Sequence, residues 1–174
     1  MECSFALTGK DYVIVAADTT AARSIVKMKI DEDKIKTLSP HLLMAYSGES
    51  GSSTPHTLHY LYTRKGLRNP LFFSLARAGD TVQFAEFIER NIRLYHIRNL
   101  YPLRPQSAAS WIRRSLAESL RSRSPYTVNL LIGGYDTAQK SPHLYWVDYL
   151  GTMASVPFAA HGYGSYFALG LLDR

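Results

Sequence analysis

Short runs of apolar and β-branched residues open the chain. Phe5 and Leu7, followed by Tyr12–Ala17, predict two strands joined by the turn sequence TGKD. The second run, YVIVAA, is almost wholly apolar, which is typical of a strand buried on both faces. Residues 33–40 and 41–48 predict another antiparallel pair of strands. The first third of the chain is therefore expected to be antiparallel sheet.

The pattern changes at Asp80. Over residues 80–99 and again over 107–123, apolar residues recur every three or four positions, which predicts two amphipathic helices. Strand-like runs then return over residues 126–136, 143–151 and 153–162. A further helix is expected to start near Ser165. Runs of strands separated by runs of helices predict an α+β fold, with helices layered on antiparallel sheets.

Residues 50–77 fit neither pattern. They lack sustained helical or alternating periodicity, and turn-forming residues are scattered through them. A connection of this length without structure is uncommon in a compact domain. One interpretation is a solvated functional loop.

Composition and charge restrict the classes of function. The chain of 174 residues fits one domain, and its single cysteine, Cys3, excludes an internal disulfide framework and favours a reducing compartment. No signal peptide or membrane-spanning run is expected. The net charge is +6, but residues 50–77 hold four basic residues and no acid. A nucleic-acid binder is thus an alternative that depends on this one segment.

The histidines give little sign of a metal site. His56 and His59 have a weak ligand spacing, but no predicted helix or strand holds them, and no metal or cofactor is expected. The glycine-rich stretch His161–Gly164 precedes a predicted helix and could cradle an anion. A plain strand-to-helix turn is the preferred interpretation.

Several motifs resemble the beta subunits of the 20S proteasome. The segments VIVAADTTAA, RSPYTVNLLIGGYD and LYWVDYLG occur in the order of that family. GDTVQFAEFIERNIRLYHIRN and PFAAHGYG narrow the likeness to its beta-4-position (beta type-2) group. The likeness runs over residues 1–49 and 78–174. It implies a single domain with the αββα four-layer sandwich of amino-terminal-nucleophile (Ntn) hydrolases.

The resemblance also assigns site residues. Active members use an amino-terminal Thr as nucleophile, with an Asp and a Lys behind it and a Gly amide as oxyanion donor. In this chain, Asp18 matches the family Asp, Lys34 matches the family Lys, and Gly48 matches the oxyanion Gly. Met1 stands at or next to the Thr position, and a thioether has no proton to lose. No catalytic residue is therefore expected, and the Asp18–Lys34 pair is interpreted as structural, because removing one partner strands the other charge.

Cys3 is the alternative nucleophile. It would need a free α-amine, so both Met1 and Glu2 would have to be removed. Trimming of an initiator Met is poor before a large residue such as Glu. Burial of Cys3 in the first strand is the preferred interpretation, and the chain is expected to begin directly at that strand.

The function implied by the resemblance is structural. The chain would pack beside other alpha and beta subunits in a hetero-oligomeric ring and support ubiquitin-dependent degradation by its neighbours. It would lie in the cytoplasm and nucleus, without nucleic acid, membrane or cofactor.

The chain departs from the family pattern in two places. Residues 50–77 form an insertion between two well-matched flanks, and we interpret it as translated intron, from a gene-model error or a retained-intron isoform. The family also continues past the sequence LLDR, so Arg174 is expected to end the chain within its third helix.

Overall fold

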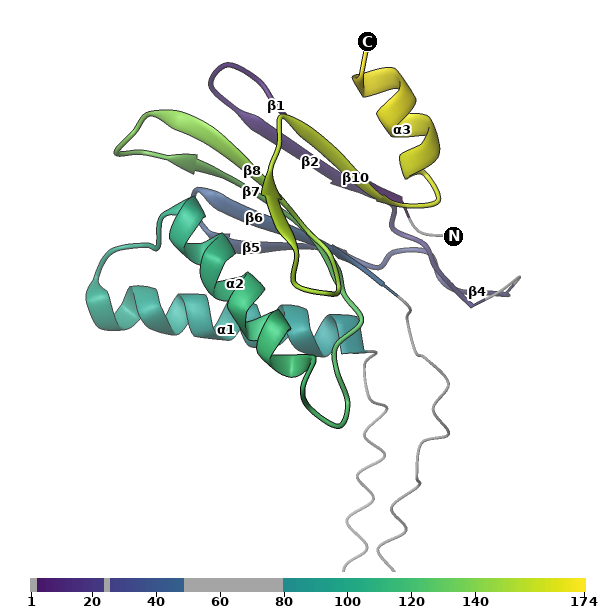
Figure 1. Cartoon of the computed structure of the whole chain (residues 1–174), viewed down its shortest axis with the longest axis horizontal. Coiled ribbons are helices and arrows are strands. Elements are labelled where there is room, and N and C mark those ends of the chain that lie inside the picture. The colour runs from purple at the N-terminus through teal and green to yellow at the C-terminus, as the bar shows by residue number, and fades with distance from the viewer. Residues whose placement is uncertain (1–2, 24–25, 49–79) are drawn as a thin grey trace, which may run out of the picture.

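A computed structural model describes residues 3–23, 26–48 and 80–174 of the chain (Figure 1). The described residues form ten strands and three helices. These are β1 (Cys3–Thr8), β2 (Val13–Ala17), β3 (Ala21–Arg23), β4 (Val26–Lys29), β5 (Ile35–Ser39), β6 (Leu42–Ser47), α1 (Asp80–Asn99), α2 (Pro105–Ser119), β7 (Asn129–Asp136), β8 (Ser141–Val147), β9 (Met153–Ser155), β10 (Phe158–Gly162) and α3 (Ser165–Leu172).

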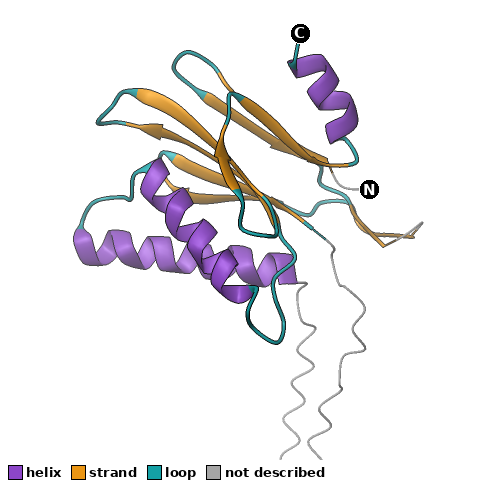
Figure 2. Ribbon diagram, in the orientation of Figure 1, coloured by secondary structure: helices purple, strands orange, loops and turns teal. Residues whose placement is uncertain are grey.

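The strands pair antiparallel in two larger sheets and one small ribbon. The larger sheet has the order β5-β6-β7-β8-β9, and the second has the order β10-β1-β2. β3 and β4 form a separate pair. Figure 2 shows the layers: α1 and α2 cover one face of the five-stranded sheet, the three-stranded sheet lies on its other face, and α3 lies beyond that. The expected α+β class is confirmed.

β7 stands at the centre and contributes to both cores. Leu130 and Ile132 face the helices, where they pack with Phe84, Ile88 and Ile112. Leu131 points the other way, toward the three-stranded sheet, because successive side chains of a strand alternate between its faces. Burial on both faces explains the continuous apolar run of this strand.

The inter-sheet core is built from small side chains. Ala6 of β1, Ala45 of β6 and Ala159 of β10 are all buried there, beside Leu131 and Leu144. Gly133 of β7 belongs to the same close approach: a Cβ atom at this position would lie 2.7 Å from Cγ1 of Val13. The two sheets can therefore pack closely because their facing positions are small.

Two of the predicted strands need correction. β2 is an edge strand of its sheet and is not buried on both faces, since Ile14 remains 46% exposed. The single strand expected over 153–162 is two strands, β9 and β10, in different sheets. Pro157 separates them, and it cannot donate a ladder hydrogen bond.

The second helix is also shifted from its predicted range of 107–123. α2 begins at Pro105, because the fixed φ of proline suits the first turn of a helix and its missing N–H is not needed there. The helix ends at Ser119, before its predicted limit. The short strands β3 and β4 were not predicted. The predicted insertion, residues 50–77, and the residues Met1, His56 and His59 lie outside the described part of the chain.

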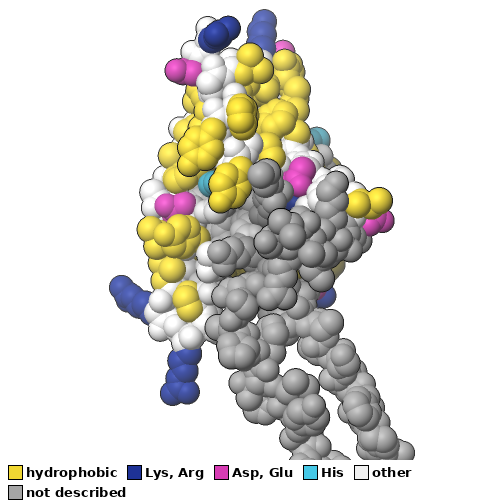
Figure 3. All heavy atoms as spheres, turned by 90° about the vertical axis from the view of Figure 1, so that its right-hand side faces the viewer, with side chains coloured by type: hydrophobic (Ala, Val, Ile, Leu, Met, Phe, Trp, Pro, Cys, Tyr) yellow, Lys and Arg dark blue, Asp and Glu magenta, His cyan; other side chains and the backbone are white. Residues whose placement is uncertain are grey.

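α3 differs from the other two helices in its packing. It contacts β10 and β1, but none of its residues is buried. Tyr166 and Phe167 are both at least 80% exposed, and Leu171 is exposed beside them. Figure 3 shows apolar side chains gathered at this end of the molecule. This surface contrasts with the helical layer on the opposite side, where α1 and α2 bury large apolar residues.

The close approach at Gly133 gives a first prediction. We expect Gly133→Ala to lower the free energy of unfolding by about 1–3 kcal/mol, because the new methyl group would press on Val13 and Val15 of the facing sheet. Urea or thermal unfolding of the full chain measures the change. Gly170→Ala is the matched control: nothing lies within 4 Å of a Cβ atom at that position in α3, so this variant should be as stable as the parent or more so. Equal stability of the two variants would contradict the prediction.

Candidate functional site

The end of β2 and the segment before β5 meet at a charged pair. Lys34 Nζ lies 3.0 Å from Oδ1 of Asp18, and it also donates a hydrogen bond of 2.8 Å to the carbonyl oxygen of Thr20. The Lys34 side chain is 5% exposed and that of Asp18 is 27% exposed. The lysine is thus a nearly buried cation, and its partners include the Asp18 carboxylate, which carries the opposite charge, and the Thr20 carbonyl, which accepts a hydrogen bond.

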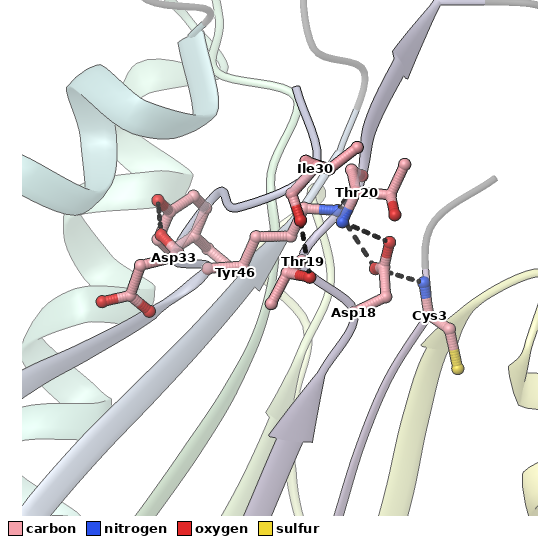
Figure 4. Close-up of polar contacts among 8 residues, drawn as sticks. Cys3, Asp18, Thr19, Thr20, Ile30, Asp33 and Tyr46 are labelled. Carbon is pink, nitrogen blue, oxygen red and sulfur yellow. Dashed lines mark hydrogen bonds and ion pairs between the residues drawn. The ribbon is translucent and has the colours of Figure 1, made fainter. Parts of the chain in front are cut away.

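Asp18 is held by backbone groups as well as by the lysine (Figure 4). The Cys3 N–H donates to Oδ1 at 3.0 Å, and the Thr20 N–H donates to Oδ2 at 3.3 Å. The Asp18 N–H in turn donates to the Cys3 carbonyl at 2.9 Å. The carboxylate therefore joins β1, the end of β2 and the segment carrying Lys34.

These contacts determine the charge state of Asp18. Partial burial raises the pKa of its carboxyl group, but the hydrogen bonds from Cys3 and Lys34, the lysine charge and the Thr20 N–H outweigh that effect. The net result is a pKa below the usual value, so the carboxylate stays ionised. Its stabilising contribution is present at neutral pH and is lost as the pH falls through the lowered pKa.

Further hydrogen bonds position the backbone beside Lys34. The Tyr46 hydroxyl donates to the Asp33 carbonyl at 2.8 Å, and the Tyr46 N–H donates to the Lys34 carbonyl at 3.1 Å. The Thr19 hydroxyl donates to the carbonyl of Ile30 at 3.0 Å. Tyr46 was not predicted from the sequence, since nothing in a strand-like run such as HLLMAYSG marks a tyrosine whose hydroxyl reaches the segment before β5.

Gly48, the third matched residue, follows β6. A Cβ atom there would collide with the carbonyl oxygen of Thr127 and lie 2.7 Å from Cγ2 of Thr81. Packing against these two residues is therefore enough to require glycine at this position. The residue needs no role as an oxyanion donor to explain its identity.

Cys3, the alternative nucleophile, lies within β1. Its residue pairs with Gly162 of β10, and its backbone N–H and C=O both bond to Asp18. Its sulfur packs against Gly164, where any Cβ atom would collide with it. The chain around Cys3 is thus occupied as ordinary strand structure.

His161 is a buried titratable residue between the two sheets. Its ring stacks on that of Trp146, with centroids 5.3 Å apart, and its Nε2 lies 3.2 Å from the Leu130 carbonyl oxygen of β7. Burial lowers the pKa of the imidazole and outweighs the raising effects of the Leu130 and Val147 carbonyls and the Asp148 charge. The stretch 161–164 passes from the end of β10 through a turn into α3, as the strand-to-helix interpretation expected.

The described residues contain no group of three or more His, Cys, Asp or Glu side chains that could hold a metal ion. Among the same residues, no helix is long and apolar enough to cross a membrane.

Comparison with known proteins identifies the family. The family model described as "Proteasome subunit" matches residues 2–53 and 74–174. The chain belongs to the proteasome subunit family. The unmatched residues, 54–73, fall within the predicted insertion.

Individual relatives from this family match the whole chain. It is 43% identical to a probable proteasome subunit beta type-4 of Neurospora crassa and 42% identical to proteasome subunit beta type-4 of Saccharomyces cerevisiae, over 174 residues in each case. It is 42% identical over 176 residues to proteasome subunit beta type-2 of Dictyostelium discoideum. All of this chain is aligned each time, with 72%, 74% and 74% of the respective relative. The predicted resemblance to the beta type-2 group is confirmed.

The charged pair gives a second prediction. Lys34→Met should destabilise the chain by about 1–3 kcal/mol, less than is typical of a fully buried pair, because Asp18 keeps partial access to water. The double variant Asp18→Asn, Lys34→Met should lose less stability than the two single variants added together. Denaturant unfolding of all three proteins at pH 7 measures both effects. As a control, Lys36→Met removes a cation two residues away and should change stability little. If the stability losses of the two single variants add up to the loss of the double variant, Asp18 and Lys34 are not coupled and the prediction is wrong.

His161 gives a third prediction, with a definite sign. The imidazole has a lowered pKa in the fold and an ordinary pKa, about 6.5, in the unfolded chain. The unfolded state therefore binds more protons as the pH falls below that value, and stability should decline. We expect His161→Gln to flatten this decline between pH 7 and pH 5 in thermal unfolding. His96→Gln, on the exposed side of α1, should leave the pH profile unchanged; an identical profile for both variants would refute the assignment.

Proposed function

We propose that this chain is a non-catalytic structural subunit of the 20S proteasome core particle. The observation that carries the proposal is identity of 42–43% over the whole chain to proteins named proteasome subunit beta type-4 and beta type-2. The chain supplies packing surfaces within the particle, and neighbouring subunits cut the substrate. Its described part adopts four layers in the order helix, sheet, sheet, helix, which agrees with the αββα sandwich of Ntn hydrolases.

The site residues have structural roles in this proposal. Met1 offers no nucleophile, and Asp18 and Lys34 hold three backbone segments together. Gly48 serves close packing. The alternative, a processed hydrolase with Cys3 as nucleophile, would need the Cys3 nitrogen to be a free amine. Both Met1 and Glu2 would have to be removed to produce it.

We also propose partner subunits, a cellular location and domain limits for this chain. The chain occupies one position in a hetero-oligomeric beta ring, in contact with other alpha and beta subunits, and takes part in ubiquitin-dependent degradation in the cytoplasm and nucleus. It binds no nucleic acid or membrane in that role. Residues 1–174 form one domain with 50–77 as an insertion, which the unmatched segment 54–73 supports.

Purified core particles test the proposal. Particles isolated through a different subunit should contain this chain, and its intact mass should retain Glu2. Presence or absence of the peptide HYLYTR in these particles shows whether the insertion is expressed. Loss of Met1 and Glu2, with labelling of Cys3 by an electrophile, would support the hydrolase instead.

A variant separates the two functions further. Cys3→Ala should enter particles normally and leave every peptidase activity of the particle unchanged, because neighbouring subunits perform the cleavage. Activity assays with fluorogenic peptides on particles from parent and variant cells measure this. Selective loss of one activity from correctly assembled particles would overturn the non-catalytic assignment.

A further inference from the structure

The connection between α2 and β7 carries two successive Arg–Ser dipeptides, Arg121-Ser122 and Arg123-Ser124, followed by Pro125. All five residues are exposed, and Figure 1 shows the chain looping out beyond the end of α2 before it returns into β7. We propose that this loop is a phosphorylation site, with Ser124 as the principal acceptor for a protein kinase that recognises arginine before serine.

The backbone at Ser124 has left the helix. The last hydrogen bond of helical type joins the Ser122 N–H to the Ser119 carbonyl at 2.9 Å. Arg123 and Ser124 lie beyond it in a bend. A proline also disfavours the helical conformation at the residue before it, so Pro125 opposes any extension of the helix through Ser124. An exposed segment outside helix and sheet is the form in which a kinase cleft can receive a chain.

Within the described part of the chain, the Ser124 hydroxyl and the two nearby arginines are available for contacts with another molecule. Neither Ser122 nor Ser124 makes a side-chain hydrogen bond there, and neither Arg121 nor Arg123 has an ion-pair partner. Two free guanidinium groups suit an acidic kinase cleft before the reaction. After the reaction they can donate charge-assisted hydrogen bonds to the phosphate.

Another Arg–Ser dipeptide, Arg114-Ser115, serves as an internal comparison. Ser115 lies inside α2, is half-buried, and its hydroxyl donates to the Trp111 carbonyl at 3.0 Å. Its sequence context resembles that of Ser124, with arginines before it, but its hydroxyl is occupied and its backbone is helical. Both serines follow an arginine, but only Ser124 has an exposed hydroxyl outside the helix, so the fold distinguishes the two dipeptides.

The chemistry is ordinary phosphoryl transfer. The Ser124 oxygen attacks the γ-phosphorus of ATP, the bond from that phosphorus to the β,γ-bridging oxygen breaks, and ADP leaves with the electron pair. The hydroxyl proton passes to the base of the kinase.

Residues 80–125 contain eight arginines and four acidic residues, a net charge of +4. One phosphate, of about −1.5 to −2, would cancel close to half of this charge.

The test uses the full chain, Mg²⁺-ATP and a kinase specific for Arg–Ser dipeptides, with the phosphate located by tandem mass spectrometry. We expect phosphate on Ser124, with little on Ser122 and none on Ser115. Ser124→Ala should remove most of the incorporated phosphate. Absence of phosphate from 122–124, or equal modification of Ser115, would overturn the proposal.

Rate measurements test the role of the arginines. Arg123→Gln should lower kcat/KM for Ser124 by about tenfold, equivalent to about 1.4 kcal/mol. Arg113→Gln makes the same change of charge at an exposed position of α2 and should leave kcat/KM unchanged. An equal effect of both substitutions would mean that net charge, and not the loop, directs the kinase, and would overturn the assignment.

Discussion

The close packing of the two larger sheets is the constraint on which the rest of the structure depends. Alanines from β1, β6 and β10 and Gly133 of β7 let the sheets approach across a thin core. Small side chains bury little apolar area, so this interface contributes less hydrophobic free energy than the opposite face of the five-stranded sheet, where Phe84 and Ile88 pack. The inter-sheet layer therefore fixes geometry, while the helical layer supplies more of the apolar burial.

That geometry brings Asp18 and Lys34 together. β2 ends at Ala17, one residue before the carboxylate, and β5 begins at Ile35, one residue after the lysine. Each residue therefore sits where a strand of one sheet ends or a strand of the other begins, so the registry of the two sheets sets the distance between them. Backbone bonds from Cys3 and Thr20 add further ties at the same point. Removal of Asp18 would take the carboxylate away from a nearly buried lysine, which preserves the pair on grounds of stability alone.

The success of sequence-based prediction followed the strength of the local signal. α1 was predicted at its observed limits, residues 80–99, because twenty residues of helical spacing leave little ambiguity. The pair β3 and β4 was missed because segments of three and four residues carry too little pattern. β2 was assigned to a doubly buried position because composition does not reveal that a strand is at an edge. The resemblance to a family supplied Asp18 and Lys34, whereas Tyr46 and His161 owe their roles to contacts across long stretches of sequence.

Gly48 illustrates why surviving site motifs say little about activity. The family resemblance places it at the oxyanion position, yet the Thr127 carbonyl and the Thr81 side chain leave no room for any larger residue. Asp18 and Lys34 are likewise required by the burial of the lysine. Each of the three residues would therefore be retained in a fold that has lost its chemistry. Asp18, Lys34 and Gly48 therefore do not by themselves distinguish an enzyme from a scaffold in this fold.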